Sequence, residues 1–188
     1  MRKRAYFLQN EDFDVEVKSW VSEVVRAYYH KRFAKKRFPR RLTPRYATTL
    51  YKVFVSDKKL MRDTDRVFRD YLDKYYANGE FEKIPWYDLF FWEFRMSSWN
   101  GLVITGEHLI SFDITIPYNN RELLRTMLLS PVEARRKDEL HRAIMRKMNP
   151  EIADCGVSVT NLKHTNTRAW AERLYLEVFS RLNIMEKR

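Results

Sequence analysis

The positive charges that follow Pro131 are the side chains of this sequence best placed for chemistry. Arg135, Arg136 and Lys137 lie shortly after a turn at residues 117–120 and the helix that this turn begins. Cations gathered near one connection can hold phosphate or carboxylate oxygens, and an arginine does so through two parallel hydrogen bonds. The same residues also suit a solvated helix start, so charge alone leaves both interpretations open.

A second and denser group of charges lies between His30 and Arg45, where no acidic residue occurs. Its cationic side chains are Lys31, Arg32, Lys35, Lys36, Arg37, Arg40, Arg41 and Arg45. Charge of this density attracts polyanions by releasing counterions, and the interleaved Phe33 and Phe38 can stack on nucleic-acid bases. Two other interpretations stay open: a helix end whose phenylalanines pack into the core, or a surface that docks on an acidic partner chain.

Composition narrows the class of protein. The 188 residues have a net charge of +11, and the excess lies in residues 1–62, because residues 63–188 hold 19 Lys/Arg and 19 Asp/Glu. Four glycines cannot supply a phosphate-binding loop or a dinucleotide-binding fingerprint. The single cysteine, Cys155, and the spacing of the four histidines predict no metal site. Neither an apolar run of about 18 residues nor a signal core occurs, so we expect a cytoplasmic protein without a membrane span.

Apolar periodicity predicts a mostly α-helical fold: one domain over residues 1–188, with about seven helices and at most one short extended segment. The predicted helices run from Asp14 to about Phe33, from Pro44 through Phe54, over residues 58–77, 84–99, 121–129 and 135–148, and from Thr167 onward. Residues 108–116 are the extended segment. In the last helix, the side chains predicted to face the core are Trp170, Leu174, Val178 and Phe179.

Short motifs also recur in a fixed order over about residues 85–183. The run from Ser111 to Leu123, then Pro131, Arg135 and residues 137–141, resembles two successive segments of asparagine synthetase-like proteins, E-x-R-x-P-F-L-D-x-x-L and a proline-arginine segment before a K-x-x-L-R helix. These proteins belong to the adenine-nucleotide α-hydrolase group. Residues 88–99, 149–151 and 173–179 are similar to the family's D-x-x-S-M, L-P-E and Y-x-x-x-F segments.

The resemblance implies a chemistry and a role for four residues. Family members activate a carboxylate with ATP, release pyrophosphate, and let an amine attack the adenylate. By position, Lys137 is the catalytic cation that stabilises negative charge at the reacting phosphate. The substrate-binding residues implied in the same way are Arg95, Arg135 and Asp113.

The sequence departs from the family pattern at the ATP-binding half. The S-G-G-x-D-S pyrophosphate loop and the glycine-rich G-E-G-x-D-E-x-x-G segment are absent, Asn119 and Asn120 replace Leu-Asp, and Thr115 stands where arginine is usual. ATP and Mg²⁺ are therefore expected only with a partner chain that carries the loop.

Three functions follow as expectations. The first is a split or truncated subunit of an ATP-dependent amide-forming enzyme, or a fragment of one, inactive alone. The second is a non-enzymatic basic helical module that binds nucleic acid or another polyanion through residues 1–62. The third is a helical interaction protein that retains the fold without its chemistry.

Overall fold

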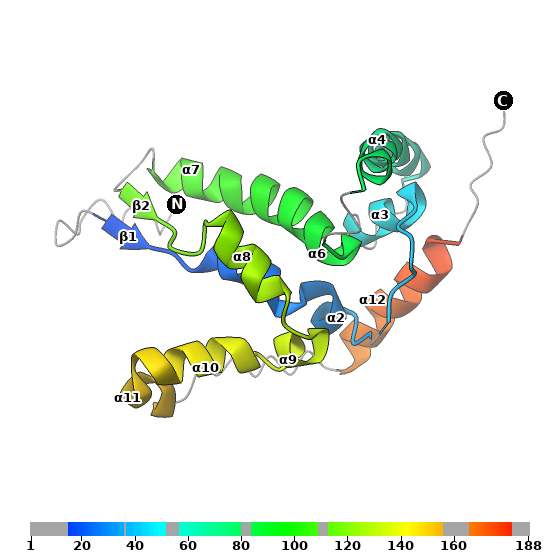
Figure 1. The fold of residues 1–188 in the computed structure, drawn as a ribbon. Helices are drawn as coiled ribbons and strands as arrows, with labels where there is room; N and C mark the ends of the chain where they lie inside the picture. Colours follow the sequence, from blue (N-terminus) through cyan, green and yellow to red (C-terminus); the bar gives the residue numbers. More distant parts are fainter. Residues whose placement is uncertain are drawn as a thin grey trace. The chain divides into compact units, whose positions relative to one another are not determined.

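The computed structural model describes residues 15–35, 37–51, 57–79, 84–108, 113–155 and 166–181. These residues are mostly helical, as predicted, with one two-stranded parallel sheet (Figure 1). No helix among them has both the length and the apolar character that crossing a bilayer requires. Contacts group the chain into two compact units, which are described separately: unit 1 is residues 1–28 and 90–141, and unit 2 is residues 29–89 and 142–188. The single-domain prediction stays a prediction.

The described residues form the following helices and strands. In chain order they are β1 (Val15–Val17), the 3₁₀-helix η1 (Trp20–Arg26), α2 (Tyr28–Arg32), α3 (Pro44–Tyr51), α4 (Lys58–Ala77), α6 (Trp86–Phe90), the π-helix η2 (Phe91–Asn100), α7 (Gly101–His108), β2 (Asp113–Thr115), α8 (Arg121–Leu128), α9 (Val132–Arg136), α10 (Glu139–Met148), α11 (Pro150–Asp154) and α12 (Asn166–Phe179).

The described part of unit 1 starts with a strand where the sequence predicts a helix. Val15, Glu16 and Val17 pair in parallel with β2, and the Lys18 N–H donates to the Thr115 carbonyl at 2.9 Å. Val15 and Val17 are β-branched and suit this extended backbone, but their partner strand is distant in sequence. The prediction of a helix is therefore wrong for residues 15–17, whereas Asp14, the predicted helix start, lies outside the described residues. The expected extended segment at 108–116 is confirmed in part, by β2.

The core of unit 1 forms around η1. This short helix packs against η2, α8 and α9, and Val24 and Val25 are buried in it. Leu124 and Met127 of α8 are buried as well. The Asn120 side chain accepts a hydrogen bond from the Leu123 N–H at 2.9 Å and so caps α8, whose start the sequence predicts correctly.

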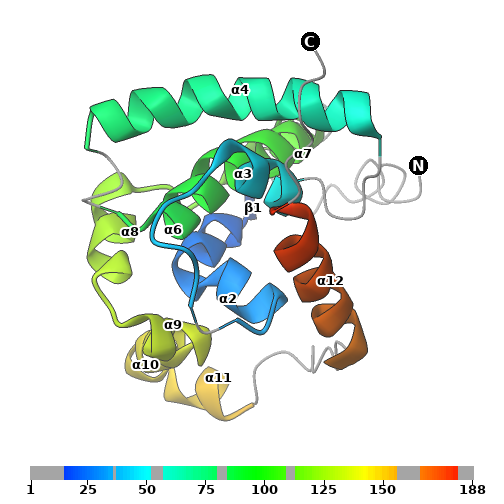
Figure 2. The ribbon, with the colours of Figure 1, turned by 90° about the vertical axis from the view of Figure 1, so that its right-hand side faces the viewer.

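Unit 2 is built on the packing of α3 against α4 and α12. Figures 1 and 2 both show α3 lying beside the long α4. The bounds of α4 agree with the predicted helix at 58–77, whereas the part of the predicted second helix beyond Tyr51 lies outside the described residues. The buried apolar side chains of unit 2 include Phe33, Leu42, Leu50, Met61, Phe68, Leu72 and Leu176.

The N-cap of α4 supports a first prediction. The Asp57 carboxylate accepts from the Leu60 N–H at 2.9 Å, which satisfies one of the unpaired donors of the first turn. Asp57→Ala is therefore expected to lower the free energy of unfolding by about 1 kcal/mol and the melting temperature by about 2–4 °C. The matched control is Asp70→Ala, an exposed aspartate within α4; equal melting temperatures for the two variants would contradict the capping role.

Candidate functional site

The helix formed by α6, η2 and α7 changes its hydrogen-bonding pattern at its centre. η2 is a π-helix of ten residues between two α-helical ends. In a π-helix each N–H bonds to the carbonyl five residues earlier, so residues four or five apart lie on one side. The side chains that share the pocket-lining side are Phe91, Arg95, Met96, Trp99 and Asn100. Because π-helical turns are rare and often occur at functional sites, this side of η2 is a candidate binding surface.

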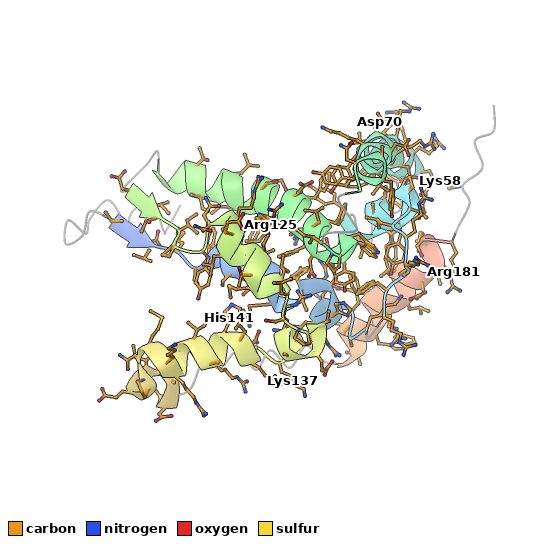
Figure 3. The ribbon with its side chains drawn as sticks, in the orientation of Figure 1. Lys58, Asp70, Arg125, Lys137, His141 and Arg181 are labelled. Atoms are coloured by element: carbon orange, nitrogen blue, oxygen red, sulfur yellow. The ribbon has the colours of Figure 1, made fainter. Side chains whose placement is uncertain are left out.

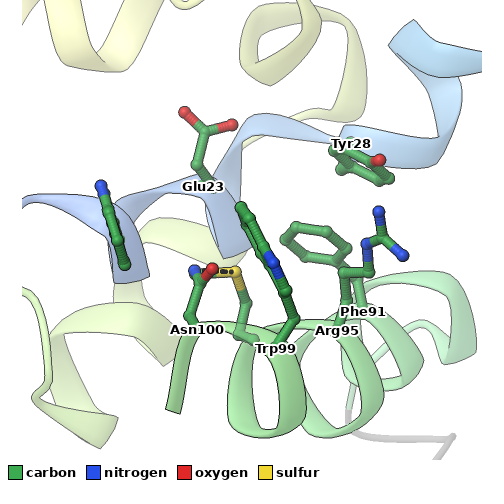
Figure 4. A pocket seen from close by; sticks show the side chains of 8 residues that line it. Glu23, Tyr28, Phe91, Arg95, Trp99 and Asn100 are labelled. Atoms are coloured by element: carbon green, nitrogen blue, oxygen red, sulfur yellow. Dashed lines mark hydrogen bonds between the residues drawn. The ribbon is translucent and has the colours of Figure 1, made fainter. Parts of the chain in front are cut away.

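This side of η2 and the residues around η1 enclose a pocket of about 410 Å³ within unit 1 (Figure 4). Its aromatic walls are two pairs of rings. Trp20 and Trp99 are nearly parallel, with centroids 6.2 Å apart and planes inclined by 11°, and Tyr28 stacks on Phe91 at 4.3 Å. A mostly apolar pocket of this size, with few polar groups, is typical of small-molecule sites.

Of the two charged side chains that line the pocket, Glu23 forms an ion pair, whereas Arg95 forms none among the described residues. Glu23 is held by an ion pair with Arg26, and Arg26 also donates to both oxygens of Asp138, at 2.8 and 2.9 Å. The hydrogen bond to Asp138 raises the pKa of Arg26, although burial opposes this change. Arg95 has no ion pair among the residues that the structure describes. The pocket therefore contains a cation that is free to meet an anionic group.

Of the four residues implied by the family resemblance, Arg95 alone lines this pocket. Asp113 lies exposed in β2. Arg135 is a buried residue of α9, and its Nε donates to the Ser130 carbonyl at 3.1 Å. Lys137 lies in the turn after α9, with its side chain 61% exposed. Within the described chain the four residues are thus not gathered in one pocket.

The prediction of one continuous helix over residues 135–148 is wrong, because a turn at Lys137 interrupts it. The chain instead forms α9 and α10, separated by Lys137 and Asp138. Asp138 has a φ of 57°, in the left-handed region, which interrupts the helix. Its carboxylate binds Arg26 of η1, a distant contact that helical periodicity cannot indicate.

The basic stretch of residues 31–45 divides into paired and exposed cations. Three of them form ion pairs within unit 2: Arg32 with Glu172, Lys35 with Glu177, and Arg45 with Asp65. Lys31 is half-buried, Lys36 lies outside the described residues, and Arg37, Arg40 and Arg41 are exposed. Phe33 is fully buried, and Phe38 lies edge-on to His30 and Trp86, so the interpretation in which both phenylalanines pack describes these two rings well.

The backbone around the exposed arginines is held by two aromatic side chains. Trp86 Nε1 donates to the Pro39 carbonyl at 2.9 Å. The Tyr76 hydroxyl accepts from the Leu42 N–H at 2.7 Å and donates to the Leu42 carbonyl at 3.1 Å. Arg41 lies over the Tyr76 ring, 4.4 Å from its centroid. The cations between these anchors are therefore presented by an ordered loop.

The two units also differ in charge. Unit 2 contains 25 Lys/Arg and 13 Asp/Glu, whereas unit 1 contains 11 and 12. Unit 2 thus carries the whole positive excess, including the part contributed by residues 142–188. Sequence analysis placed the positive excess in residues 1–62 and therefore did not identify the contribution of residues 142–188.

Comparison with known proteins identifies no relative of this chain. No protein-family model, curated protein or solved structure matches the chain. The resemblance to asparagine synthetase-like proteins therefore stays a prediction.

Sequence reasoning identified Arg95 but missed the rest of the pocket. Phe91, Arg95 and Trp99 recur every four residues, a visible signal, but the prediction of an α-helix apolar on several faces concealed it. Trp20 and Tyr28 could not be found locally, because the predicted helix from Asp14 to Phe33 replaced η1 and its turn at Ala27, where φ is 52°.

Proposed function

We propose that the chain belongs to an asparagine synthetase-like, ATP-dependent amide-forming enzyme and completes the substrate side of its active site, while a partner chain binds ATP and Mg²⁺. The ordered motifs from Asp113 to His141 support the proposal. The observation that carries it is the exposure of Lys137 in the turn between α9 and α10.

The exposure of Lys137 leaves its charge available. Its Nζ lies 3.9 Å from a Glu139 oxygen, and both side chains are exposed. Such a surface pair contributes little, so little is lost when the lysine turns to a phosphate. Figure 3 shows the Lys137 side chain pointing away from the ribbon, and the Arg26–Asp138 ion pair holds the turn that carries it. A cation placed beside a developing anion is strong catalytic help.

The helix after this turn offers a surface for a partner. Leu140, Ile144 and Met148 lie on one side of α10, as the sequence predicts, and no residue of α10 is buried. Met148 is 80% exposed, and Ile152 of α11 is exposed as well. Leu140 and Ile144 are half-buried, so Met148 and Ile152 are the exposed apolar side chains that favour a protein interface. ATP and Mg²⁺ are assigned to the partner because the sequence lacks the S-G-G-x-D-S pyrophosphate loop.

The test begins with the partner and continues with its activity. Affinity capture with the full chain from its native cells is expected to recover a chain that contains an S-G-G-x-D-S loop. In the complex, Lys137→Ala is expected to lower ATP-dependent pyrophosphate release about 100-fold, whereas Lys58→Ala, which removes an exposed lysine of α4, leaves it unchanged. Failure to recover such a chain, or equal activity of the Lys137 and Lys58 variants, overturns the proposal.

We propose polyanion binding by unit 2 as the second function, because a separate observation favours it. Unit 2 carries the whole positive excess, and Arg37 and Arg40 form no ion pair among the residues that the structure describes. Guanidinium groups on an anchored loop lose little conformational entropy when they bind phosphates. The fixed backbone at Pro39 and Leu42 thus favours binding by the exposed arginines.

The salt dependence of binding tests this second function. The affinity for a single-stranded oligonucleotide is expected to fall linearly on a log–log plot against salt concentration. The double variant Arg37→Ala, Arg40→Ala is expected to reduce the slope by about 1.5. The matched control is the double variant Arg121→Ala, Arg125→Ala in α8. Absence of binding at low salt, or equal slopes for the two double variants, contradicts the assignment.

A further inference from the structure

The pocket of unit 1 contains a buried hydrogen-bond acceptor without a donor. Asn100 is 4% exposed, and its Nδ2 donates to the Met96 Sδ at 3.1 Å. Its Oδ1 accepts no hydrogen bond from any described residue. Figure 4 shows the Asn100 amide directed away from the helix, on the side of the pocket. Because leaving a buried acceptor without a donor is unfavourable, this oxygen favours a ligand that brings an N–H group.

The aromatic walls favour a flat ligand. Trp99 is 58% exposed although it is the largest kind of apolar side chain, and its ring is nearly parallel to that of Trp20. A planar ring gains binding free energy by stacking on such a side chain. An aromatic ligand with an N–H on its edge would satisfy both the tryptophan and the Asn100 oxygen.

The charges around the pocket argue against a cationic ligand. The Arg95 guanidinium carbon lies 6.0 Å from the Trp99 ring centroid, and Arg95 has no ion pair among the described residues. The Lys18 ammonium, 4.6 Å from the Trp20 centroid, is already paired with Glu16 at 2.7 Å. The carboxylate of Glu23 is already paired with Arg26. A methylated ammonium group, which aromatic pockets often bind, would therefore meet positive charge here, whereas a neutral ring with an anionic substituent would not.

We propose that this pocket binds a nucleobase. The ring stacks on Trp99, an exocyclic or ring N–H donates to Asn100 Oδ1, and a phosphate attached to the nucleoside pairs with Arg95. The base comes from a free nucleotide or from a single-stranded nucleic acid, and the chemistry of recognition is the same for both. This site goes beyond both proposed functions, because neither Lys137 nor the arginines of residues 37–41 line it.

Calorimetry with the full chain tests the base-binding part with uncharged probes. At least one of adenosine, guanosine, cytidine and uridine is expected to bind saturably, with an affinity that is nearly independent of salt. Trp99→Ala is expected to weaken this binding at least 10-fold, because stacking is lost. Trp170→Ala, which removes an exposed tryptophan of α12, is the control and is expected to change nothing. Absence of binding by all four nucleosides, or equal affinities for the two variants, overturns the proposal.

Two further comparisons test the polar contacts. For adenosine, N6,N6-dimethyladenosine lacks the base N–H and is expected to bind at least 10-fold more weakly; Asn100→Leu is expected to remove this difference.

A nucleoside 5′-monophosphate is expected to bind more tightly than its nucleoside, and Arg95→Gln to remove that gain. Preferential binding of choline would contradict the charge argument. Equal affinity for a mononucleotide and a short single-stranded oligonucleotide identifies a free nucleotide as the ligand, and tighter binding of the oligonucleotide identifies a strand.

The test of nucleobase binding can succeed or fail independently of the tests of the two proposed functions. Binding of an uncharged nucleoside involves no phosphate, so it persists in the Arg37→Ala, Arg40→Ala variant whether or not this variant binds oligonucleotides. It likewise persists in Lys137→Ala, whatever the activity of the complex.

Discussion

Arg135→Ala is expected to lower the free energy of unfolding by about 3–5 kcal/mol, because the arginine is buried to 2% exposure and hydrogen-bonded inside unit 1. Its Nε donates to the Ser130 carbonyl, which ties the end of α9 to the turn between α8 and α9. Alanine removes both this bond and the volume of one of the largest fully buried side chains. The measurement is urea-induced unfolding followed by circular dichroism.

The matched control is Lys137→Ala, two residues away in the exposed turn. This substitution is expected to change the free energy of unfolding by about 0.5 kcal/mol or less, which also keeps the activity test of Lys137 free of folding effects. If Arg135→Ala is as stable as the Lys137 variant, the arginine is dispensable for the fold, and the substrate-binding role implied by the family resemblance becomes the better explanation for it.

The sequence predicted the elements that local signals define. α4 and α8 begin at the caps Asp57 and Asn120, and both have a clear apolar periodicity, so their bounds agree with prediction to within a residue or two. Only one strand of the two-stranded sheet, β2, could be predicted from the sequence. β1 exists because β2 pairs with it, and a three-residue strand carries no local signal strong enough to compete with a helical pattern.

The last helix shows why apolar periodicity can point to the wrong side. Trp170, Leu174 and Val178 were predicted to face the core, but all three are exposed. Leu176 and the carboxylate of Glu172 are buried instead. Phe179 is half-buried and stacks on Tyr175. An acidic side chain can occupy a buried position only when a cation neutralises it, and the cation that does so, Arg32, is far away in sequence.

The candidate sites also combine features that are visible in the sequence with features that only the structure shows. The cations of residues 31–45 are obvious in the sequence, but the structure was needed to separate the paired Arg32, Lys35 and Arg45 from the exposed ones. The pocket depends on the π-helical pattern of η2 and on η1, and neither follows from residue type. Tertiary contacts therefore decided both sites, as they did the orientation of α12.

Glu172→Ala is expected to lower the free energy of unfolding of unit 2 by about 3 kcal/mol at neutral pH. The carboxylate is buried, accepts from Arg32 Nε at 2.8 Å and from Arg168 Nε at 3.2 Å, and so joins α2 to α12. Its removal leaves the partly buried Arg32 without this partner. Arg168→Ala is the control: that side chain is mostly exposed, so its loss is expected to cost less than about 1 kcal/mol.

The same ion pairs predict how the effect depends on pH. Burial alone would raise the pKa of Glu172, but the hydrogen bonds and charges of Arg32 and Arg168 lower it below the ordinary value. A carboxylate with a lowered pKa in the folded state stabilises the protein fully above its unfolded pKa of about 4.3. This contribution is lost as the pH falls through the lower folded pKa, because the unfolded state then binds its proton first.

The difference in stability between the wild type and Glu172→Gln is therefore expected to be constant from pH 7 to about pH 5 and to shrink as the pH falls below about 4. Glutamine keeps the size of the side chain, so the comparison isolates the charge. Urea-induced unfolding at pH 7, 5, 4 and 3 measures it. A difference that stays constant over this range, or grows in acid, would show that the Glu172 carboxylate is not stabilised by Arg32 and Arg168.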